Sequence, residues 1–291
     1  MMVPMVNLSN EDMNELTKDE LIDKIKELNN SIKLQEDFLL NISHDLRNPI
    51  NVILSILQCF KYLDNTEKDQ KNAKKKKEYR KLIKRNTLKM VKLIDNLIDT
   101  TKLEGNYYKV NKKNLDIINI IEGIVVSVDK YAKQKKIELI FDTNVEECII
   151  AVDPECIDRI IMNLLSNAIK FSNEGSHVLV CIFVDKENIK ISIKDEGQGI
   201  SPKDQEFVFN RFVQANQGNN ESKGSGIGLE LVNHLTKLHG GNISLKSEIG
   251  VGSEFIITFP INKVNIDDES YELVKRNKID QLEVEFSDIY L

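Results

Sequence analysis

The sequence predicts two architectures in series: a long helical hairpin that pairs into a dimeric four-helix bundle, followed by an α/β sandwich with a mixed sheet. Three observations support this fold class. Apolar residues follow a heptad spacing in the first third of the chain, a polar segment interrupts that spacing, and short alternating strands between amphipathic helices follow it. At 291 residues the chain is long enough for two domains.

A heptad seam predicts the first helix. Its apolar residues are spaced by fours and threes with one interruption, at Gln35, and they are Leu21, Ile25, Leu28, Ile32, Leu39, Ile42 and Leu46. The seam resumes beyond Pro49, and a second helix is predicted over about 79–105 after a polar turn over 64–77. One hairpin buries little apolar surface, so we expect it to complete itself by pairing as a homodimer.

Short apolar or alternating segments predict the strands of the second part, at 137–142, 148–152, 177–184, 189–194, 242–247 and 253–259. Helices are predicted between them, at about 117–133, 154–171 and 226–239. We divide the chain into an N-terminal segment with a signalling coiled coil (1–31), the hairpin (32–108), the α/β domain (109–263) and a C-terminal tail (264–291) of unpredicted packing.

Composition excludes several classes of protein. The net charge of −6, with one basic run at Lys74–Lys77, predicts no nucleic-acid partner. That run is interpreted as the solvated end of the hairpin. The alternative is that it binds an acidic membrane or a regulator. The chain has no apolar stretch long enough for a membrane span and no signal peptide, and its four cysteines are far apart. We therefore expect a cytoplasmic polypeptide, either independent or the cytosolic portion of a membrane receptor.

Three polar residues line up on the helix predicted over 154–171. Asn163, Asn167 and Lys170 fall at i, i+4 and i+7, apart from the apolar stripe of the same helix. Amide oxygens can hold Mg²⁺ and an ammonium can meet phosphate charge, so the stripe suits a magnesium triphosphate. For such a trio alone, a solvated helix face is the favoured interpretation.

The strand predicted at 189–194 favours the nucleotide site over the solvated helix face. Its apolar residues alternate, and continuing by two places Asp195 on the same inward face at the strand end. A carboxylate there needs a donor, which an adenine amino group would supply. Gly197 and Gly199 follow, and glycines let a backbone approach a ligand closely.

A second glycine-rich segment, GSGIGL, precedes a predicted helix. Free N–H groups and the helix dipole favour phosphate at such a place, and the glycines concerned are Gly224, Gly226 and Gly228. The stretch 214–223 between the two glycine segments is polar and has the composition of a mobile lid.

The motifs together resemble those of sensor histidine kinases. DRIIMNLLSNAIKFS is similar to their N box, DEGQGIS to the first glycine box, FVFNRF to the F box, GSGIGL to the second glycine box and FLLNISHDLRNPINVI to the H box. The resemblance covers about residues 32–260. It implies an ATP domain of the superfamily that includes DNA gyrase, heat-shock chaperone ATPases and mismatch-repair ATPases.

The resemblance also implies roles for single residues. Asn163 matches the Mg²⁺-binding position, and Asn167 and Lys170 match further nucleotide contacts. Asp195 matches the adenine-reading aspartate, beside the loop of Gly197 and Gly199. Three glycines match the lid-hinge and phosphate-side positions, namely Gly224, Gly226 and Gly228. Arg211 matches the F-box region, where an arginine helps to neutralise the γ-phosphate.

His44 is the predicted phosphoryl acceptor, whereas the other three histidines are interpreted as structural. Asp45 can hydrogen-bond one ring nitrogen while the other attacks ATP, and the family implies onward transfer to an aspartate of a response-regulator receiver domain. In related kinases an amide or hydroxyl at the position of Asn48 supports regulator dephosphorylation, so we expect a bifunctional kinase and phosphatase. Pro49 is expected to loosen or bend the helix below His44.

Two other functions fit parts of the pattern. One is an ATP hydrolase or a Ser/Thr-directed kinase on the same ATP fold, which would lack the hairpin motif around His44. The other is a dimeric scaffold that binds nucleotide without catalysis, which would show erosion in a nucleotide box. No sensor domain precedes the hairpin in this sequence, so an upstream domain or partner is expected to deliver the signal.

Overall fold

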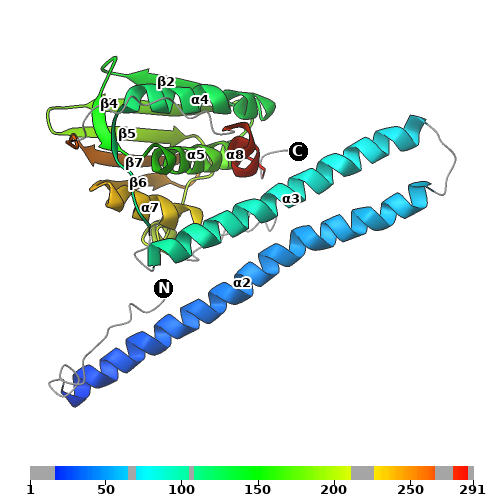
Figure 1. Ribbon diagram of the computed structural model, residues 1–291, viewed down its shortest axis with the longest axis horizontal. Helices are drawn as coiled ribbons and strands as arrows, with labels where there is room; N and C mark the ends of the chain where they lie inside the picture. The colour runs from blue at the N-terminus through cyan, green and yellow to red at the C-terminus, as the bar shows by residue number, and fades with distance from the viewer. Residues whose placement is uncertain (1–16, 65–69, 105–107, 211–225, 266–277, 288–291) are drawn as a thin grey trace.

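The computed structural model describes residues 17–64, 70–104, 108–210, 226–265 and 278–287. It consists of a helical hairpin, α2 (Lys18–Asp64) and α3 (Gln70–Glu104), beside an α/β domain. Figure 1 shows α3 lying between α2 and the α/β domain. The predicted fold class, a helical hairpin followed by a mixed-sheet domain, is confirmed.

Helix α2 is a single element of 47 residues that continues through Pro49. Proline has no N–H, so the carbonyl of Asp45 has no intrahelical partner at that position. The helix nevertheless resumes at once, and Figure 1 shows its axis curving rather than breaking. No helix in the part of the chain that the structure describes is long and apolar enough to cross a membrane.

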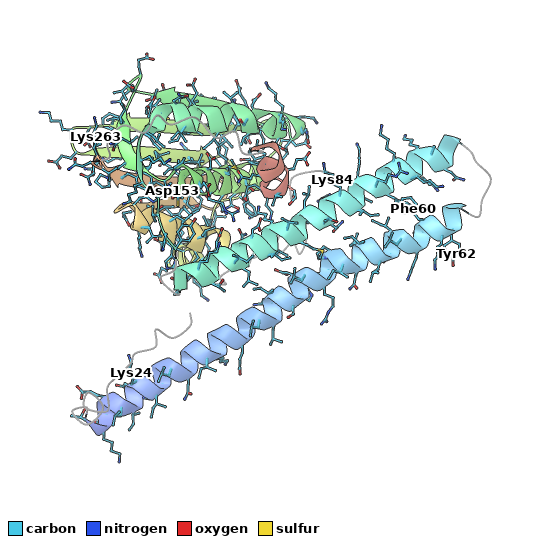
Figure 2. The ribbon with its side chains drawn as sticks, viewed as in Figure 1. Lys24, Phe60, Tyr62, Lys84, Asp153 and Lys263 are labelled. Carbon is cyan, nitrogen blue, oxygen red and sulfur yellow. The ribbon has the colours of Figure 1, made fainter. Side chains whose placement is uncertain are left out.

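Helix α3 begins earlier than the sequence pattern predicts. The run Lys74–Lys77 was expected in the polar turn, but α3 begins at Gln70 and includes it. Lysine has a high helix propensity and keeps its charged end in water, so a polar run can extend a helix without an apolar face. Near the turn the two helices meet through Phe60 (labelled in Figure 2) and Tyr79, whose ring centroids lie 5.7 Å apart in an edge-on arrangement.

The α/β domain is built on a five-stranded mixed sheet in the order β2-β4-β5-β7-β6. Strands β2 and β4 are parallel and the other neighbours are antiparallel. The strands are β2 (Glu138–Thr143), β4 (His177–Val184), β5 (Asn188–Asp195), β6 (Asn242–Glu248) and β7 (Gly252–Pro260). A two-stranded sheet joins β3 (Ile149–Val152) to β1 (Lys113–Asp116), a short strand that the sequence analysis missed.

Three helices cover one face of this sheet, as Figure 1 shows: α4 (Ile117–Gln134), α5 (Pro154–Phe171) and α7 (Gly228–Leu238). The short helix α6 (Pro202–Gln205) follows β5. Inward residues of adjacent strands pair directly, for example Ile193 with Val180, and both are buried. This alternation places the core between sheet and helices.

The C-terminal tail is partly ordered against the rest of the protein. Residues Lys278–Glu285 form α8, and Leu282 and Phe286 belong to the buried core of the α/β domain. The sequence pattern does not predict the packing of this segment. Its apolar residues are too few to show a periodicity, so their place becomes clear only from their contacts with the α/β domain.

Candidate functional site

Helix α5 carries three of the predicted site residues, and its first turn is tightly fixed. Asp153 is the N-cap: its Oδ1 accepts from the backbone N–H groups of Glu155 at 3.0 Å and Cys156 at 3.4 Å. Pro154 occupies the first turn, where a missing N–H costs nothing. The other carboxylate oxygen of Asp153 accepts from the N–H of Asn111 at 2.8 Å, which ties the helix start to the segment after the hairpin.

His239 fixes the same point from the end of α7. Its Nε2 accepts from the backbone N–H of Asp153 at 3.1 Å, and its Nδ1 lies 2.8 Å from the carbonyl oxygen of Leu235. The two contacts select the tautomer with the proton on Nδ1. Burial lowers the pKa of His239 below its ordinary value of 6.5, with Lys112 lowering it further and the Leu235 carbonyl and Asp153 opposing the change.

A pH-dependent stability follows from His239. In the unfolded chain this side chain takes up a proton below about pH 6.5, whereas in the folded protein it stays neutral to lower pH. Stability should therefore fall as pH drops from about 7 through 6.5 and level off below the folded pKa. We expect His239→Gln, which keeps an acceptor, to remove about 1 kcal/mol of the difference between the free energies of unfolding at pH 7.5 and 5.5.

The measurement is urea denaturation at both pH values. Wild-type protein measured under the same conditions is the reference. An unchanged pH dependence in His239→Gln would show that this histidine does not titrate differently on folding.

The end of α5 is held by a lysine from the turn after α4. The ammonium of Lys135 donates to three carbonyl oxygens, those of Ile169, Lys170 and Ser172, at 2.9, 2.5 and 2.9 Å. The last carbonyls of a helix have no intrahelical donors and carry partial negative charge, so a cation there stabilises the end. Both ends of α5 are thus held by side chains and backbone of neighbouring segments.

The amide pair on α5 lies against the start of α7. Asn163 is 5% exposed, and its Oδ1 accepts from Nδ2 of Asn167 at 3.4 Å. A Cβ placed on Gly228, the first residue of α7, would lie 2.6 Å from the same Oδ1. The absence of a side chain at Gly228 therefore leaves the space that the Asn163 amide occupies.

Asp195 lies at the end of β5, inward and 5% exposed, as the alternation predicts. Its Oδ1 accepts from the N–H of Gly197 at 2.9 Å and of Ser253 at 3.3 Å. Burial raises the pKa of Asp195, and these two hydrogen bonds oppose the rise. A buried carboxylate with remaining acceptor capacity can take a hydrogen bond from an amino group of a ligand.

The glycines of the first loop are required by close backbone contacts. A Cβ on Gly197 would lie 2.5 Å from the carbonyl oxygen of Phe171 at the end of α5. Gly199 has φ +70°, and a Cβ there would lie 2.0 Å from the carbonyl oxygen of Glu248. The loop after β5 is therefore pressed against both α5 and the end of β6, where only glycine fits.

Two residues of this region were missed by the sequence analysis. Gly252 has φ +137°, and a Cβ there would lie 2.0 Å from the carbonyl oxygen of Asp195. Ser253 follows it, 7% exposed, and donates its N–H to Asp195 as described. A glycine such as Gly252 beside the last predicted strand is a sequence signal for a close backbone contact. Only the pairing of β7 with β5 shows that this contact is with Asp195.

The remaining predicted residues of the nucleotide site are Gly226, which the structure describes, and two that it does not. Gly226 has φ +70° and lies two residues before the start of α7, which suits a hinge. Gly224 and Arg211 lie outside the described residues, as does the predicted lid at 214–223.

The predicted acceptor His44 is exposed on α2, and its two neighbours in the motif lie beside one ring nitrogen. Nδ1 of His44 is 3.4 Å from Nδ2 of Asn48 and 3.7 Å from Oδ1 of Asp45. The two contacts require different tautomers. With the proton on Nδ1, Asp45 can accept it and Nε2 is a free nucleophile; with the proton on Nε2, the Asn48 amide can donate to Nδ1.

The predicted site residues thus form two groups, and the two groups are separate from each other. Asn163 lies beside both Asn167 and Gly228, and Gly197 in the loop after Asp195 lies against the end of the same helix. His44, Asp45 and Asn48 form the second group, on α2, and Figure 1 shows α3 lying between α2 and the α/β domain.

The first group fits a magnesium-bound nucleotide in chemical terms. Asn163 offers a fixed amide oxygen, and Mg²⁺ usually takes one or two protein oxygens together with phosphate oxygens and water. Among the described residues no cluster of three or more His, Cys, Asp or Glu side chains could hold a metal on its own. The nucleotide phosphates would therefore have to supply part of the coordination.

Two family models match the chain. Residues 34–106 match the His Kinase A (phospho-acceptor) domain, and residues 152–263 match the Histidine kinase-, DNA gyrase B-, and HSP90-like ATPase domain. The first match contains the His44 group, and the second contains the sheet-domain group.

Similar proteins agree with these matches. Sensor histidine kinase WalK of Bacillus subtilis (strain 168) is 28% identical over 237 residues, which make up 80% of this chain and 38% of that protein. The chain thus spans well under half of this relative. The solved histidine kinase AdeS of Acinetobacter baumannii shares the fold, with a TM-score of 0.56 and 22% identity over 76% of this chain and 98% of that chain.

A further solved structure is that of histidine kinase ThkA in complex with response regulator protein TrrA. Its TM-score is 0.60 at 17% identity, over 85% of this chain and 68% of that chain. At this identity the likeness establishes the fold.

Proposed function

Because this chain belongs to the sensor histidine kinase family, we propose that it transfers the γ-phosphoryl group of ATP to its own His44 and then to an aspartate of a response regulator. One observation carries the proposal. An exposed imidazole with a carboxylate at its Nδ1 lies on the hairpin of the same chain whose α/β domain holds Asn163 and Asp195 in a fixed, buried arrangement.

The chain's residues would divide the reaction as follows. Asp45 holds the proton of Nδ1, which leaves the lone pair of Nε2 free as the attacking group. Asp195 binds the adenine amino group, and Asn163, Asn167 and Lys170 hold the triphosphate. Bound through Asn163, Mg²⁺ would neutralise phosphate charge. Arg211 and Gly224 complete the site as proposed γ-phosphate and lid contacts.

The test is transfer in two steps. Protein incubated with γ-labelled ATP and freed from nucleotide should carry label on His44, and adding a receiver domain should move that label to an aspartate. A nucleotide-binding scaffold would bind ATP without becoming labelled. A Ser/Thr-directed kinase of the same ATP fold would give an acid-stable product, whereas phosphohistidine is acid-labile and base-stable.

Dephosphorylation of the regulator is the second proposed activity, and Asn48 is its proposed residue. The Asn48 amide lies beside His44 on the exposed face of α2, where it can orient a water toward a docked phosphoaspartate. We expect Asn48→Ala to slow regulator dephosphorylation by roughly 10- to 100-fold while autophosphorylation stays near the wild-type rate.

The matched control is Asn41→Ala, an exposed asparagine on the same helix before His44. It should leave both activities at wild-type rates. Undiminished phosphatase activity in Asn48→Ala would remove this residue from the proposal, without affecting the kinase assignment.

A homodimer is proposed from the hairpin surface. In a single copy, seam residues of α2 that should be buried in a bundle are exposed: Ile25 by 56%, Ile32 by 49% and Leu39 by 57%. Apolar residues at heptad spacing are stabilised when a second helix pair covers them. Light scattering of the purified chain should therefore give twice the mass of one copy.

The remaining parts of the proposal concern partners and place. The complex of ThkA with its regulator supports a receiver domain as the partner of the hairpin. We place the reaction in the cytoplasm, where ATP is available and where the four cysteines, free in this structure, would stay reduced. We propose that an upstream sensor domain or partner supplies the signal through the helix before residue 32. We also propose that the hairpin domain spans 32–108 and the ATP-binding domain spans 109–263.

A further inference from the structure

Helix α8 packs its apolar residues into the α/β domain. Leu282 is 3% exposed and Phe286 is fully buried. The Phe286 ring stacks on that of Tyr131 in α4, with centroids 4.8 Å apart and an interplanar angle of 18°. Burial of two such side chains stabilises the attachment of α8 to this domain strongly.

Charged residues next to these apolar residues bind α8 to the hairpin. The ammonium of Lys92 in α3 lies 3.1 Å from Oε1 of Glu285 and donates to the carbonyl oxygen of the same residue at 2.8 Å. These side chains are only 16% and 6% exposed. A second pair joins Lys84 (labelled in Figure 2) to Glu283 at 2.7 Å, in a more open position.

The nucleotide helix takes part in the same junction. Arg159 of α5 forms an ion pair with Asp99 of α3, and Oγ of Ser166 donates to the Glu285 carbonyl at 3.4 Å. Helices α3, α5 and α8 therefore meet in one network. The α/β domain is held against the face of α3 that points away from α2, as Figure 1 shows.

We propose that α8 is a clasp that keeps the α/β domain docked on α3 and so holds the proposed nucleotide site away from His44. The inference rests on the proposed function, because it assigns a rate-controlling role to a contact outside the reacting groups. In the docked arrangement α3 separates the helix of His44 from the α/β domain of the same copy (Figure 1), so phosphoryl transfer within one copy requires the domain to leave this position.

The contacts of α8 with the α/β domain and with α3 differ in a way that suits release. The apolar residues of α8 face the α/β domain, whereas the contacts with α3 are ion pairs and hydrogen bonds. A polar junction can exchange its partners for water at moderate cost, while separating Phe286 from Tyr131 would expose aromatic surface. The domain should therefore undock from α3 with α8 still attached to it.

The test uses the Lys92–Glu285 pair in the full chain. Lys92→Glu places two carboxylates together at the junction, and we expect it to raise the initial rate of His44 labelling by about tenfold, since breaking a buried pair shifts a docking equilibrium at least that far. The exchange variant Lys92→Glu/Glu285→Lys restores opposite charges and should return the rate toward wild type. Lys246→Glu, the same charge change on β6, should have no effect.

Hydrogen exchange and nucleotide affinity distinguish the possible outcomes. Undocking should speed amide exchange in α8 and the facing part of α3 while the sheet and the affinity for ATP stay unchanged. Faster exchange in Lys92→Glu without faster labelling would overturn the clasp as a control on catalysis, and unchanged exchange would overturn the clasp itself. If no variant or wild-type protein labels His44, the kinase proposal fails, and the exchange data still decide whether α8 holds the domains together.

Discussion

His44→Gln is expected to remove all acid-labile label from protein incubated with γ-labelled ATP, a loss on the order of a thousandfold or more. Glutamine is polar and of similar length, so it keeps an exposed hydrogen-bonding side chain on α2. It has no ring nitrogen with a free lone pair, so no phosphorus–nitrogen bond can form. Because His44 lies on the hairpin and not in the α/β domain, affinity for ATP should stay at the wild-type value.

The control for this substitution is His177→Gln, which alters an exposed histidine at the start of β4. That variant should label as wild type does. Equal labelling of His44→Gln and wild type would place the acceptor elsewhere and remove the kinase assignment as stated. Label that resists acid would indicate a hydroxyl acceptor, as in the alternative Ser/Thr-directed enzyme.

Gly228→Ala is expected to weaken ATP binding by roughly 30-fold with little change in thermal stability. The new methyl group would lie 2.6 Å from Oδ1 and 2.8 Å from Nδ2 of Asn163, so the amide must turn away. A displaced side-chain end costs the fold little, and alanine favours the helix that begins there. The proposed ligand would then lose the Asn163 amide, whose Oδ1 is the proposed metal contact and whose Nδ2 can donate to a phosphate oxygen. A hydrogen bond to a charged group contributes about 2 kcal/mol, or roughly 30-fold in affinity.

Gly123→Ala provides the matched helix control. A Cβ at Gly123 in α4 would meet no atom within 4 Å. This variant should be more stable than wild type by about 1 kcal/mol and should bind ATP normally. Calorimetric titration with magnesium and ATP, together with melting curves, checks both variants. Normal affinity in Gly228→Ala would show that Asn163 is not a nucleotide contact.

The two halves of the proposed reaction differ in how far local sequence defines them. Asn48 lies one helical turn after His44, so helix geometry alone brings it to the same face, and Asp45 is the next residue in the chain. The alternation along β5 likewise predicts that Asp195 is inward, because a strand repeats every two residues. Such short-range relations need no knowledge of the remaining fold.

Other features depend on contacts between distant segments. Gly252 adjoins Asp195 only because β7 pairs with β5, and His239 supports the start of α5 only because α7 ends beside it. The start of α3 was predicted too late because lysines carry no apolar periodicity, although they form helix readily. Each of these was decided by packing partners that a local pattern does not contain.

The sequence by itself determined the order of hairpin and sheet domain, the family motifs and the positions of the proposed reacting groups, because periodicity and spacing are properties of neighbouring residues. Only the tertiary structure decided that the C-terminal segment lies between α3 and the α/β domain. Its docking depends on Tyr131, Lys92 and Ser166 from three different helices, and their convergence is a consequence of the folded chain.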